Sequence, residues 1–459
     1  MRRRSLVARS ALILALFAQT LPAAAAPDTS KAGPKATSRL PALETFALPN
    51  GLQVAVMRSD AAPIVSVQVW YHAGSKDEPR DHRGTAHMFE HMMFKGSARV
   101  RADAHAQSIN ALGGYVSAAT DEDGTHYGET LPAEYLDYAI QLEAERMRGL
   151  QFRKAMVDGE REVVKDEIRQ QEASPFARGL LRTLAISYLK HPYAWTSSGN
   201  PRELDATSPD DLKKFYDAYY QPNNALLVVV GKISVADVKA SADKWFGAIA
   251  KAAEPPRPAK AAEEPAQTAR RREVVEPGQV GLTLVGWHVP PAKDKDSRAL
   301  QLAALVLGAG DSSRLKQRLK TPDPKTKRPL AAEAGMDAIL REDPGRAIAL
   351  GAYLDPAQAD AVEAAIFDEV AKLAATGPTA DELRRAKNQV QSGFVFGLEN
   401  AQGLGEAVGR SWILSGDASS LLRDADEVDK LSSADVQRVV KQYLSPDHAT
   451  VVVIPPKAR

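Results

Sequence analysis

The sequence predicts an α+β protein of two homologous domains, each a mainly antiparallel sheet with helices packed on one face. An internal repeat is the first observation: residues 208–230, SPDDLKKFYDAYYQPNNALLVVV, match residues 432–454, SSADVQRVVKQYLSPDHATVVVI, at a constant offset. Each copy reads as a helix, a proline and a buried strand. Between the copies, residues 250–272 change to Ala, Pro, Lys, Glu and Arg, the composition of a linker. We therefore expect domains over residues 43–249 and 273–459.

The N-terminus predicts a bacterial signal peptide over residues 1–26. Basic residues at positions 2, 3, 4 and 9 precede an apolar run, residues 11–21, and small residues that offer a cleavage site. The apolar run is too short to remain as a membrane anchor. Polar residues 27–42 predict a disordered lead. We expect an exported chain in the periplasm, with secretion as the alternative, and no membrane anchor after cleavage.

Composition excludes several classes of partner. The 459 residues hold 59 Lys and Arg against 58 Asp and Glu, which gives no basic patch for nucleic acid or for an anionic membrane surface. The chain has no cysteine, so it has neither a disulfide nor a lipid-modified cysteine. A chain of this length buries ample core without disulfides.

The elements of the first domain follow from local pattern. An Asn50-Gly51 turn between two apolar runs predicts a hairpin. Short runs that are apolar, or that alternate between apolar and polar residues, predict the strands. Longer stretches with apolar residues at helical spacing predict the helices. The expected strands are 64–71, 113–120, one that begins near 123, and 224–231; the expected helices are the run from Gly84, 102–112, 132–149 and 154–172.

The helix that begins near Gly84 contains His87-Met-Phe-Glu90-His91. Residues four apart lie one turn apart on the same face of a helix, so the two imidazoles can bind one metal ion. Glu90 lies beside the second histidine, close enough to take a proton from a water molecule that the metal activates. This H-x-x-E-H order is the inverse of the H-E-x-x-H zinc motif. The alternative is an amphipathic helix with ordinary histidines.

A catalytic zinc site needs a third protein ligand. The best candidates lie on the helix over residues 154–172, where Glu160 and Glu167 are two turns apart on one face. The alternative is a charged face in contact with solvent.

H-x-x-E-H, followed about 76 residues later by the second Glu of an E-x6-E pair, resembles the pitrilysin/insulinase family of zinc peptidases, M16. The chain is similar to the short bacterial members and to the mitochondrial processing peptidase subunits. The resemblance implies a fold of the LuxS/MPP-like metallohydrolase type and one Zn²⁺ per chain, held by His87, His91 and Glu167. It implies that Glu90 is the general base and that Glu160 orients a ligand histidine. Zinc, rather than manganese or cobalt, follows from ligand type and from the resemblance.

The strand after Gly113-Gly114 contains Ser117, Ala118, Ala119 and Thr120. In similar proteins this strand is the sheet edge that accepts the substrate as an added strand, through main-chain hydrogen bonds that tolerate varied sequences. Ser117 stands where the family usually has Asn. Without the resemblance, ordinary edge structure is an equal alternative.

The second domain departs from the active family pattern. Its helix near residues 299–307 takes the place of the zinc helix but has no His or Glu, so we expect no metal site there. Active members supply an Arg and, seven residues later, a Tyr that engage the substrate carbonyl. Here the segment begins in the family's pattern, with Ser312-Ser313-Arg314-Leu315. Lys320 then stands about where the Arg should be, a Pro/Lys-rich stretch over residues 321–329 is inserted, and the Tyr position falls near Ala332. Either this chain is weak alone, or another chain supplies the pair. Because some relatives divide these roles between two subunits, the resemblance implies as partner a homologous subunit that lacks zinc ligands and supplies the pair.

These observations predict an exported zinc endopeptidase that hydrolyses peptides or unfolded segments, as the zinc-bearing subunit of a heterodimer that closes around a chamber. One alternative is an inactive family member that serves as a scaffold or assembly subunit. Another is a protein that binds peptides along the edge strand without cutting them, although Glu90 has little purpose in a pure binder.

Overall fold

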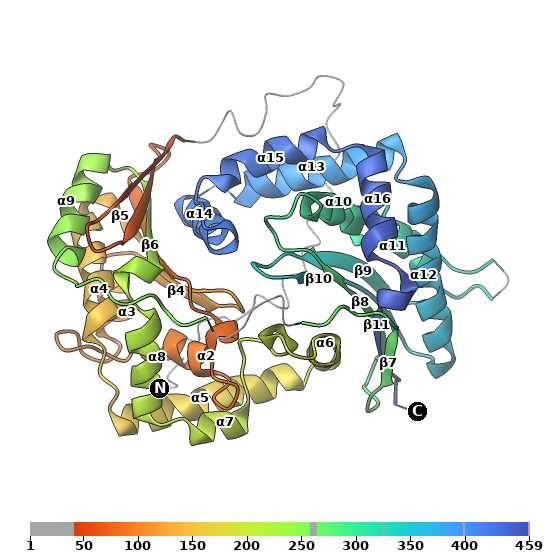
Figure 1. Cartoon of the computed structure of the whole chain (residues 1–459), viewed down its shortest axis with the longest axis horizontal. Helices are drawn as coiled ribbons and strands as arrows, with labels where there is room; N and C mark the ends of the chain where they lie inside the picture. The colour runs from red at the N-terminus through yellow and green to blue at the C-terminus, as the bar shows by residue number, and fades with distance from the viewer. Residues whose placement is uncertain (1–40, 258–263, 325, 398–399, 458–459) are drawn as a thin grey trace.

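The computed structural model describes residues 41–257, 264–324, 326–397 and 400–457. The predicted signal peptide, residues 1–26, and the predicted lead as far as residue 40 lie outside the described residues. In the ranges that the structure describes, no helix has the length and apolar character needed to cross a bilayer. The chain forms two sheets, each with its own helices, that lie side by side (Figure 1). The α+β fold of two domains is thus confirmed.

The first sheet has six strands in the order β1-β2-β6-β3-β5-β4, and only the β2–β6 pair is parallel. Its strands are β1 (Leu43–Ala47), β2 (Gln53–Arg58), β3 (Ile64–Tyr71), β4 (Tyr115–Thr120), β5 (Thr125–Pro132) and β6 (Ala225–Gly231). The predicted Asn-Gly turn joins β1 to β2, and Gly51 has the positive φ of 92° that favours glycine. Strand β4 lies at one edge of the sheet.

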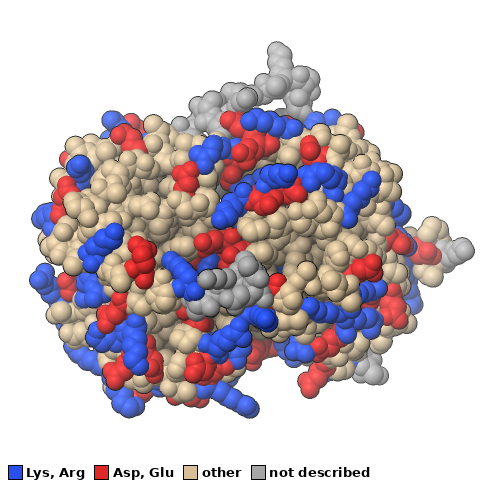
Figure 2. All heavy atoms as spheres, in the orientation of Figure 1, with Lys and Arg blue, Asp and Glu red and all other residues tan. Residues whose placement is uncertain are grey.

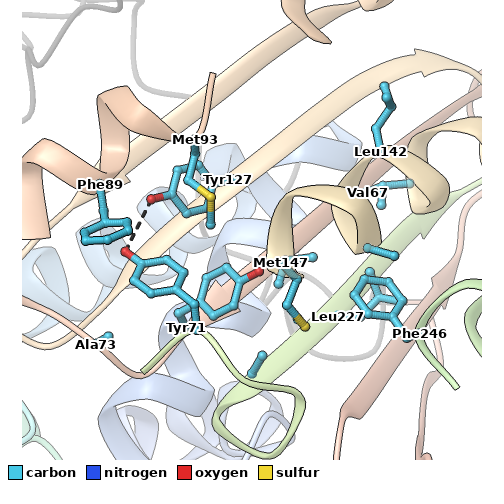
Figure 3. Packing of buried hydrophobic residues seen from close by; sticks show 14 of the residues in the cluster. Val67, Tyr71, Ala73, Phe89, Met93, Tyr127, Leu142, Met147, Leu227 and Phe246 are labelled. Carbon is cyan, nitrogen blue, oxygen red and sulfur yellow. Dashed lines mark hydrogen bonds between the residues drawn. The ribbon is translucent and has the colours of Figure 1, made fainter. Parts of the chain in front are cut away.

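One face of this sheet carries most helices of the first domain. They are α2 (Thr85–Met92), α3 (Ala104–Ala111), α4 (Leu136–Gly149), α5 (Lys154–Glu172), α7 (Pro201–Ala206), α8 (Pro209–Tyr219) and α9 (Val235–Phe246). The remaining helix, α6 (Pro175–Ser187), packs elsewhere. Phe89 anchors α2 in the core between sheet and helices, where it is fully buried beside Tyr71, Met93 and Tyr127 (Figure 3). Its ring also stacks on Tyr220 at 4.9 Å. The core therefore fixes the orientation of α2.

The second sheet repeats this arrangement with five strands in the order β7-β11-β8-β10-β9. Its strands are β7 (Arg271–Val274), β8 (Gly281–Val289), β9 (Glu333–Ile339), β10 (Gly345–Tyr353) and β11 (Thr450–Ile454), and its helices are α10 (Ser297–Gly308), α11 (Arg314–Lys320), α12 (Ala359–Thr376), α13 (Ala380–Gly397), α14 (Ala401–Ser415), α15 (Ser420–Lys430) and α16 (Ser433–Tyr443). The repeated stretches form α8–β6 and α16–β11. Both helices begin with the same capping box, Ser208 with Asp211 and Ser432 with Asp435. Helix α10 follows β8 as α2 follows β3.

In addition, one helix of each domain packs on the sheet of the other domain. Helix α14 packs on the face of the first sheet that its own helices leave open, where Leu404, Val408 and Trp412 meet apolar residues of β2, β3 and β6. Helix α6 packs in the same way on the second sheet, through Leu180 and Leu184. Helices of each domain thus cover one face of its own sheet, as predicted. The other face is covered by a helix from the other domain, α14 on the first sheet and α6 on the second, and this packing joins the domains.

The surface mixes both signs of charge. Lys and Arg are interspersed with Asp and Glu over the face seen in Figure 2, in line with the balanced composition.

Candidate metal centre

Helix α2 brings two imidazoles to one side and apolar side chains to the other. His87 and His91 lie one turn apart, with ring centroids separated by 5.1 Å, while Met88 and Phe89 point into the core. The helix begins after Gly84, whose φ of 101° lies in the region that favours glycine. The sequence therefore folds locally into a helix that exposes a pair of nitrogen ligands along one stripe.

Helix α5 lies against α2 and brings a carboxylate to these imidazoles. The Glu167 Oε2 atom lies 3.5 Å from His87 Nε2 and 3.6 Å from His91 Nε2. One ligand atom from each of the three residues lies within 4.8 Å of the other two. The fold thus brings together the three sequence-predicted ligands, although Glu167 lies 76 residues after His91 along the chain.

The donor set and the burial suit a zinc ion. Two imidazole nitrogens and one carboxylate oxygen form a ligand set of catalytic zinc sites. Glu167 Oε2 is buried, and among the described residues it makes no hydrogen bond of normal geometry. A buried acceptor without a donor is costly, and a cation between it and the two Nε2 atoms would satisfy it.

The electrostatics of the metal-free chain follow from the same contacts. Burial alone would lower the pKa of His91, but Glu160 and Glu167 outweigh it and raise this pKa to about 9. Burial alone would raise the pKa of Glu167, but His87 and His91 hold it at about 2. The site therefore presents an ionised carboxylate at neutral pH, and a metal ion that binds there displaces a proton from His91.

Glu160, on the same face of α5, contacts the other nitrogen of His91. Its Oε2 atom lies 3.3 Å from His91 Nδ1, and Lys95 Nζ lies 3.0 Å from its Oε1. A carboxylate at Nδ1 fixes the imidazole tautomer and leaves Nε2 free for a metal. Sequence reasoning missed Lys95; its only signal is a position one turn beyond His91.

Glu90 lies on α2 between the two histidines and is only 6% exposed. Sequence reasoning also missed Glu78, which precedes α2 and is 2% exposed. The Glu78 carboxylate accepts hydrogen bonds from the backbone N–H groups of Gly84 and Ala86, at 2.9 and 2.8 Å. These are N–H groups at the start of α2 that have no partner within the helix. An acidic residue shortly before a predicted helix was the available signal.

The remaining predicted residues lie where the fold places their strands and helices. Ser117, Ala118, Ala119 and Thr120 form the half-buried end of edge strand β4, which contacts α2. Lys320 ends α11, and its Nζ lies 2.9 Å from Glu333 Oε2. Ala332 directly precedes β9 and donates its backbone N–H to Ala352 at 2.7 Å.

Comparisons with known proteins show the family of the chain. Residues 53–193 match the family model of insulinase (peptidase family M16), and residues 206–390 match the model of the peptidase M16 inactive domain. The zinc protease PqqE of Helicobacter pylori is 30% identical over 92% of this chain and 94% of its own length. The uncharacterized zinc protease YmxG of Bacillus subtilis is 25% identical over 90% of this chain and 98% of its own.

Solved structures show the same two-domain fold. A protease from Helicobacter pylori superposes with a TM-score of 0.84 at 28% identity, covering 91% of this chain and 100% of that one. The first half of the periplasmic protease PqqL from Escherichia coli superposes with a TM-score of 0.70 at 20% identity, covering 90% of this chain and 92% of that one. From the two family models and the match to PqqE over nearly the whole length of both chains, it follows that this chain belongs to peptidase family M16.

Proposed function

We propose that the chain is an exported zinc-dependent endopeptidase that hydrolyses peptides or unstructured protein segments. One observation carries the proposal: His87 Nε2 and His91 Nε2 converge on an otherwise unbonded Glu167 oxygen. The names of the relatives, zinc proteases, support the choice of metal and of reaction.

In the proposed mechanism, His87, His91 and Glu167 hold one zinc ion per chain. When bound, zinc supplies Lewis-acid chemistry, which polarises the scissile carbonyl and acidifies water at neutral pH. Glu90 accepts a proton from the attacking water and returns it to the leaving amide nitrogen. Glu160, held by Lys95, keeps the His91 Nδ1 proton in place and so keeps Nε2 a ligand.

The substrate lies along β4 as an added strand. The free edge of the sheet at Ser117–Thr120 offers main-chain groups to an extended peptide, and this strand contacts the helix that bears Glu90. Main-chain pairing favours unfolded segments over folded proteins and makes cleavage tolerant of sequence.

We infer that a second, homologous subunit without zinc ligands completes the site. Lys320 and Ala332 stand where active members supply an Arg and a Tyr, and one missing oxyanion donor costs on the order of 10²–10³ in rate. This chain covers 48% of the full PqqL chain, a length that would hold two such units. Two such units would close around a chamber.

The proposed place of action is the periplasm. The predicted signal peptide over residues 1–26 supports export, and PqqL, which shares the fold, is described as periplasmic. The proposed domains are residues 43–249, with the metal centre, and residues 273–459, without one, joined by residues 250–272.

The second candidate is a scaffold or peptide-binding subunit that does not cut. The residues at positions 320 and 332 favour it, as does the match of residues 206–390 to an inactive-domain model. The presence of Glu90 between the two histidines speaks against it.

Cleavage of a pool of unstructured peptides distinguishes these functions. The mature chain is assayed alone and with its co-purifying homologue, before and after chelation and zinc re-addition, with a folded protein as the control substrate. We expect chelator-sensitive cleavage of peptides only in the mixture. Full activity of the single chain would refute the divided site, and zinc binding without cleavage in either sample would favour the scaffold.

A further inference from the structure

Two corresponding turns meet where the domains join. The turn between β4 and β5 contains Asp121, Glu122 and Asp123, and the turn between β9 and β10 contains Arg341 and Glu342. Arg341 Nη1 lies 3.1 Å from Asp121 Oδ2, and Arg341 also pairs with Glu122. The backbone N–H of Glu342 donates to Asp123 Oδ2 at 3.0 Å. The second domain therefore holds the end of the candidate substrate strand.

The same turn also contacts the segment that leads into α2. Lys76 Nζ lies 2.8 Å from Asp123 Oδ1 and also pairs with the Glu342 carboxylate. His72 Nε2 lies 2.5 Å from Glu342 Oε2. The Lys76 side chain is 8% exposed and that of Asp123 is fully buried, whereas His72 and Glu342 are 23% and 29% exposed, so the network is buried at one end and partly exposed at the other. Charges in such a network depend strongly on their partners.

Residues 75–78 connect this network to the start of α2. Ser75 and Lys76 donate their backbone N–H groups to Asp121 and Glu122, both at 3.1 Å. Two residues after Lys76, Glu78 binds the backbone N–H groups of Gly84 and Ala86. A continuous path of contacts thus runs from Glu342 through Lys76 and Glu78 to the start of the helix that carries His87 and His91.

We propose that Arg341 and Glu342, in the domain without the metal ligands, are positioning residues for α2 and for strand β4. Arg341 holds the end of the strand, and Glu342 holds Lys76 and with it the segment that caps α2. Together they fix the strand that would bind substrate relative to the helix that would bind zinc. Any effect of these two residues on catalysis rests on the proposed function, whereas their effect on the position of α2 does not.

The chain offers a matched control for the loss of a charge pair between the domains. Arg182 on α6 pairs with Glu273 on β7, with Nε–Oε1 and Nη2–Oε2 distances of 2.8 and 2.6 Å. This pair joins the same two domains but does not contact residues 72–78. Glu273→Gln therefore removes an interdomain carboxylate without disturbing the path to α2.

Hydrogen exchange of the metal-free chain tests the proposal without any turnover. In Glu342→Gln we expect the amides of residues 85–92 to exchange at least about tenfold faster than in the wild type, because local opening of α2 becomes easier. In Glu273→Gln the same amides should stay within about twofold of the wild type. Equal exchange at α2 in the two variants would overturn the proposal.

Zinc affinity and steady-state kinetics give independent readouts. We expect Glu342→Gln to weaken zinc binding by about three- to tenfold, less than the loss of a direct partner of a ligand causes. In the active assembly, kcat should fall more than KM rises, because α2 and β4 are misaligned after the peptide has bound. Wild-type zinc affinity in Glu342→Gln would contradict the proposed path.

If Glu342→Gln does not fold, His72→Gln is a milder variant that tests the same proposal. His72→Gln removes one contact of the same carboxylate and leaves Lys76 in place, and it should shift exchange at α2 in the same direction by a smaller factor. Unchanged exchange in His72→Gln together with a misfolded Glu342→Gln would count against the proposal. If the wild type cuts no peptide, the proposed function fails, while the exchange data still decide this inference.

Discussion

At the scale of residues, two of the carboxylates on α5, those of Glu160 and Glu167, contact different nitrogens of His91. Glu167 faces the Nε2 side of both imidazoles, whereas Glu160 contacts only His91 Nδ1. Two acids on one face of one helix therefore have separate proposed roles, one as a ligand and one as the group that orients a ligand.

This difference predicts unequal losses of zinc affinity. Glu167→Gln should remove nearly all zinc binding, because it removes one of three ligands. Glu160→Gln should weaken binding by about 10–100-fold, as outer partners of ligands typically do. Glu162→Gln, at an exposed position on the same helix, is the matched control and should bind as the wild type does. Competition with a chromogenic chelator measures all three; similar losses in Glu160→Gln and Glu167→Gln would contradict the assignment.

Local spacing and the family resemblance together predicted which residues meet, but not what supports them. Helical periodicity placed His87 with His91, and Glu160 with Glu167, on one face of a helix each. The resemblance, not the spacing, assigned the two helices to one site. Lys95 and Glu78 were missed because their contacts depend on how α2 is placed against α5 and on how the chain enters the helix. The chemical roles of the predicted residues remain predictions.

At the scale of elements, close approach of α14 to the first sheet depends on two glycines one turn apart. A Cβ on Gly409 would lie 2.1 Å from Trp70 Cε2, and a Cβ on Gly405 would lie 2.5 Å from Gln68 Nε2. Trp70 and Gln68 both belong to β3, in the middle of the sheet. Helix α14 can therefore pack this closely on β3 only because Gly405 and Gly409 have no side chain.

Gly409→Ala should therefore destabilise the chain by about 1–3 kcal/mol, the usual cost of overpacking. Gly393→Ala is the matched control, since it lies within α13 and a Cβ there meets nothing within 4 Å. It should be neutral or stabilise by up to about 1 kcal/mol through helix propensity. Denaturant unfolding of both variants measures the difference. Equal stability of the two variants would show that α14 does not need this close approach.

The sequence predicted elements within each domain better than contacts between domains. Helix α5 has the predicted bounds, 154–172, because its pattern is local. Strand β4 begins at Tyr115 rather than at residue 113, because Gly113 has a φ of 82° and belongs to the turn. The exchange of α6 and α14 was not predicted, since an apolar helix face does not reveal which sheet it covers.

At the scale of the whole molecule, the ion network around Glu342 makes the contact between the domains sensitive to acid. Burial would raise the pKa of Glu342, but His72 and Lys76 outweigh it and hold this pKa at about 2, below its ordinary value of 4.5. A carboxyl whose folded pKa is lowered stabilises the folded state above its unfolded pKa and loses this effect as the pH falls towards the folded value. The shift corresponds to at most about 3 kcal/mol.

The stability difference between the wild type and Glu342→Gln should therefore depend on pH. It should be fully present above about pH 5.5 and should shrink as the pH falls from about 4.5 to about 2, because protonated Glu342 resembles glutamine. Denaturant unfolding of both proteins at several pH values in this range provides the comparison. A difference that is constant with pH would mean that the Glu342 charge does not hold the domains together.

The most direct test of the proposed peptidase site combines the zinc content and the peptide cleavage of Glu90→Gln, in the same assembly as the wild type. Glu90 is the proposed base and not a ligand, so we expect one zinc ion per chain in both proteins. Cleavage should be slower in the variant by at least about 10²-fold, the usual contribution of a general base. Wild-type cleavage by zinc-loaded Glu90→Gln would show that Glu90 is not the base of a zinc peptidase site.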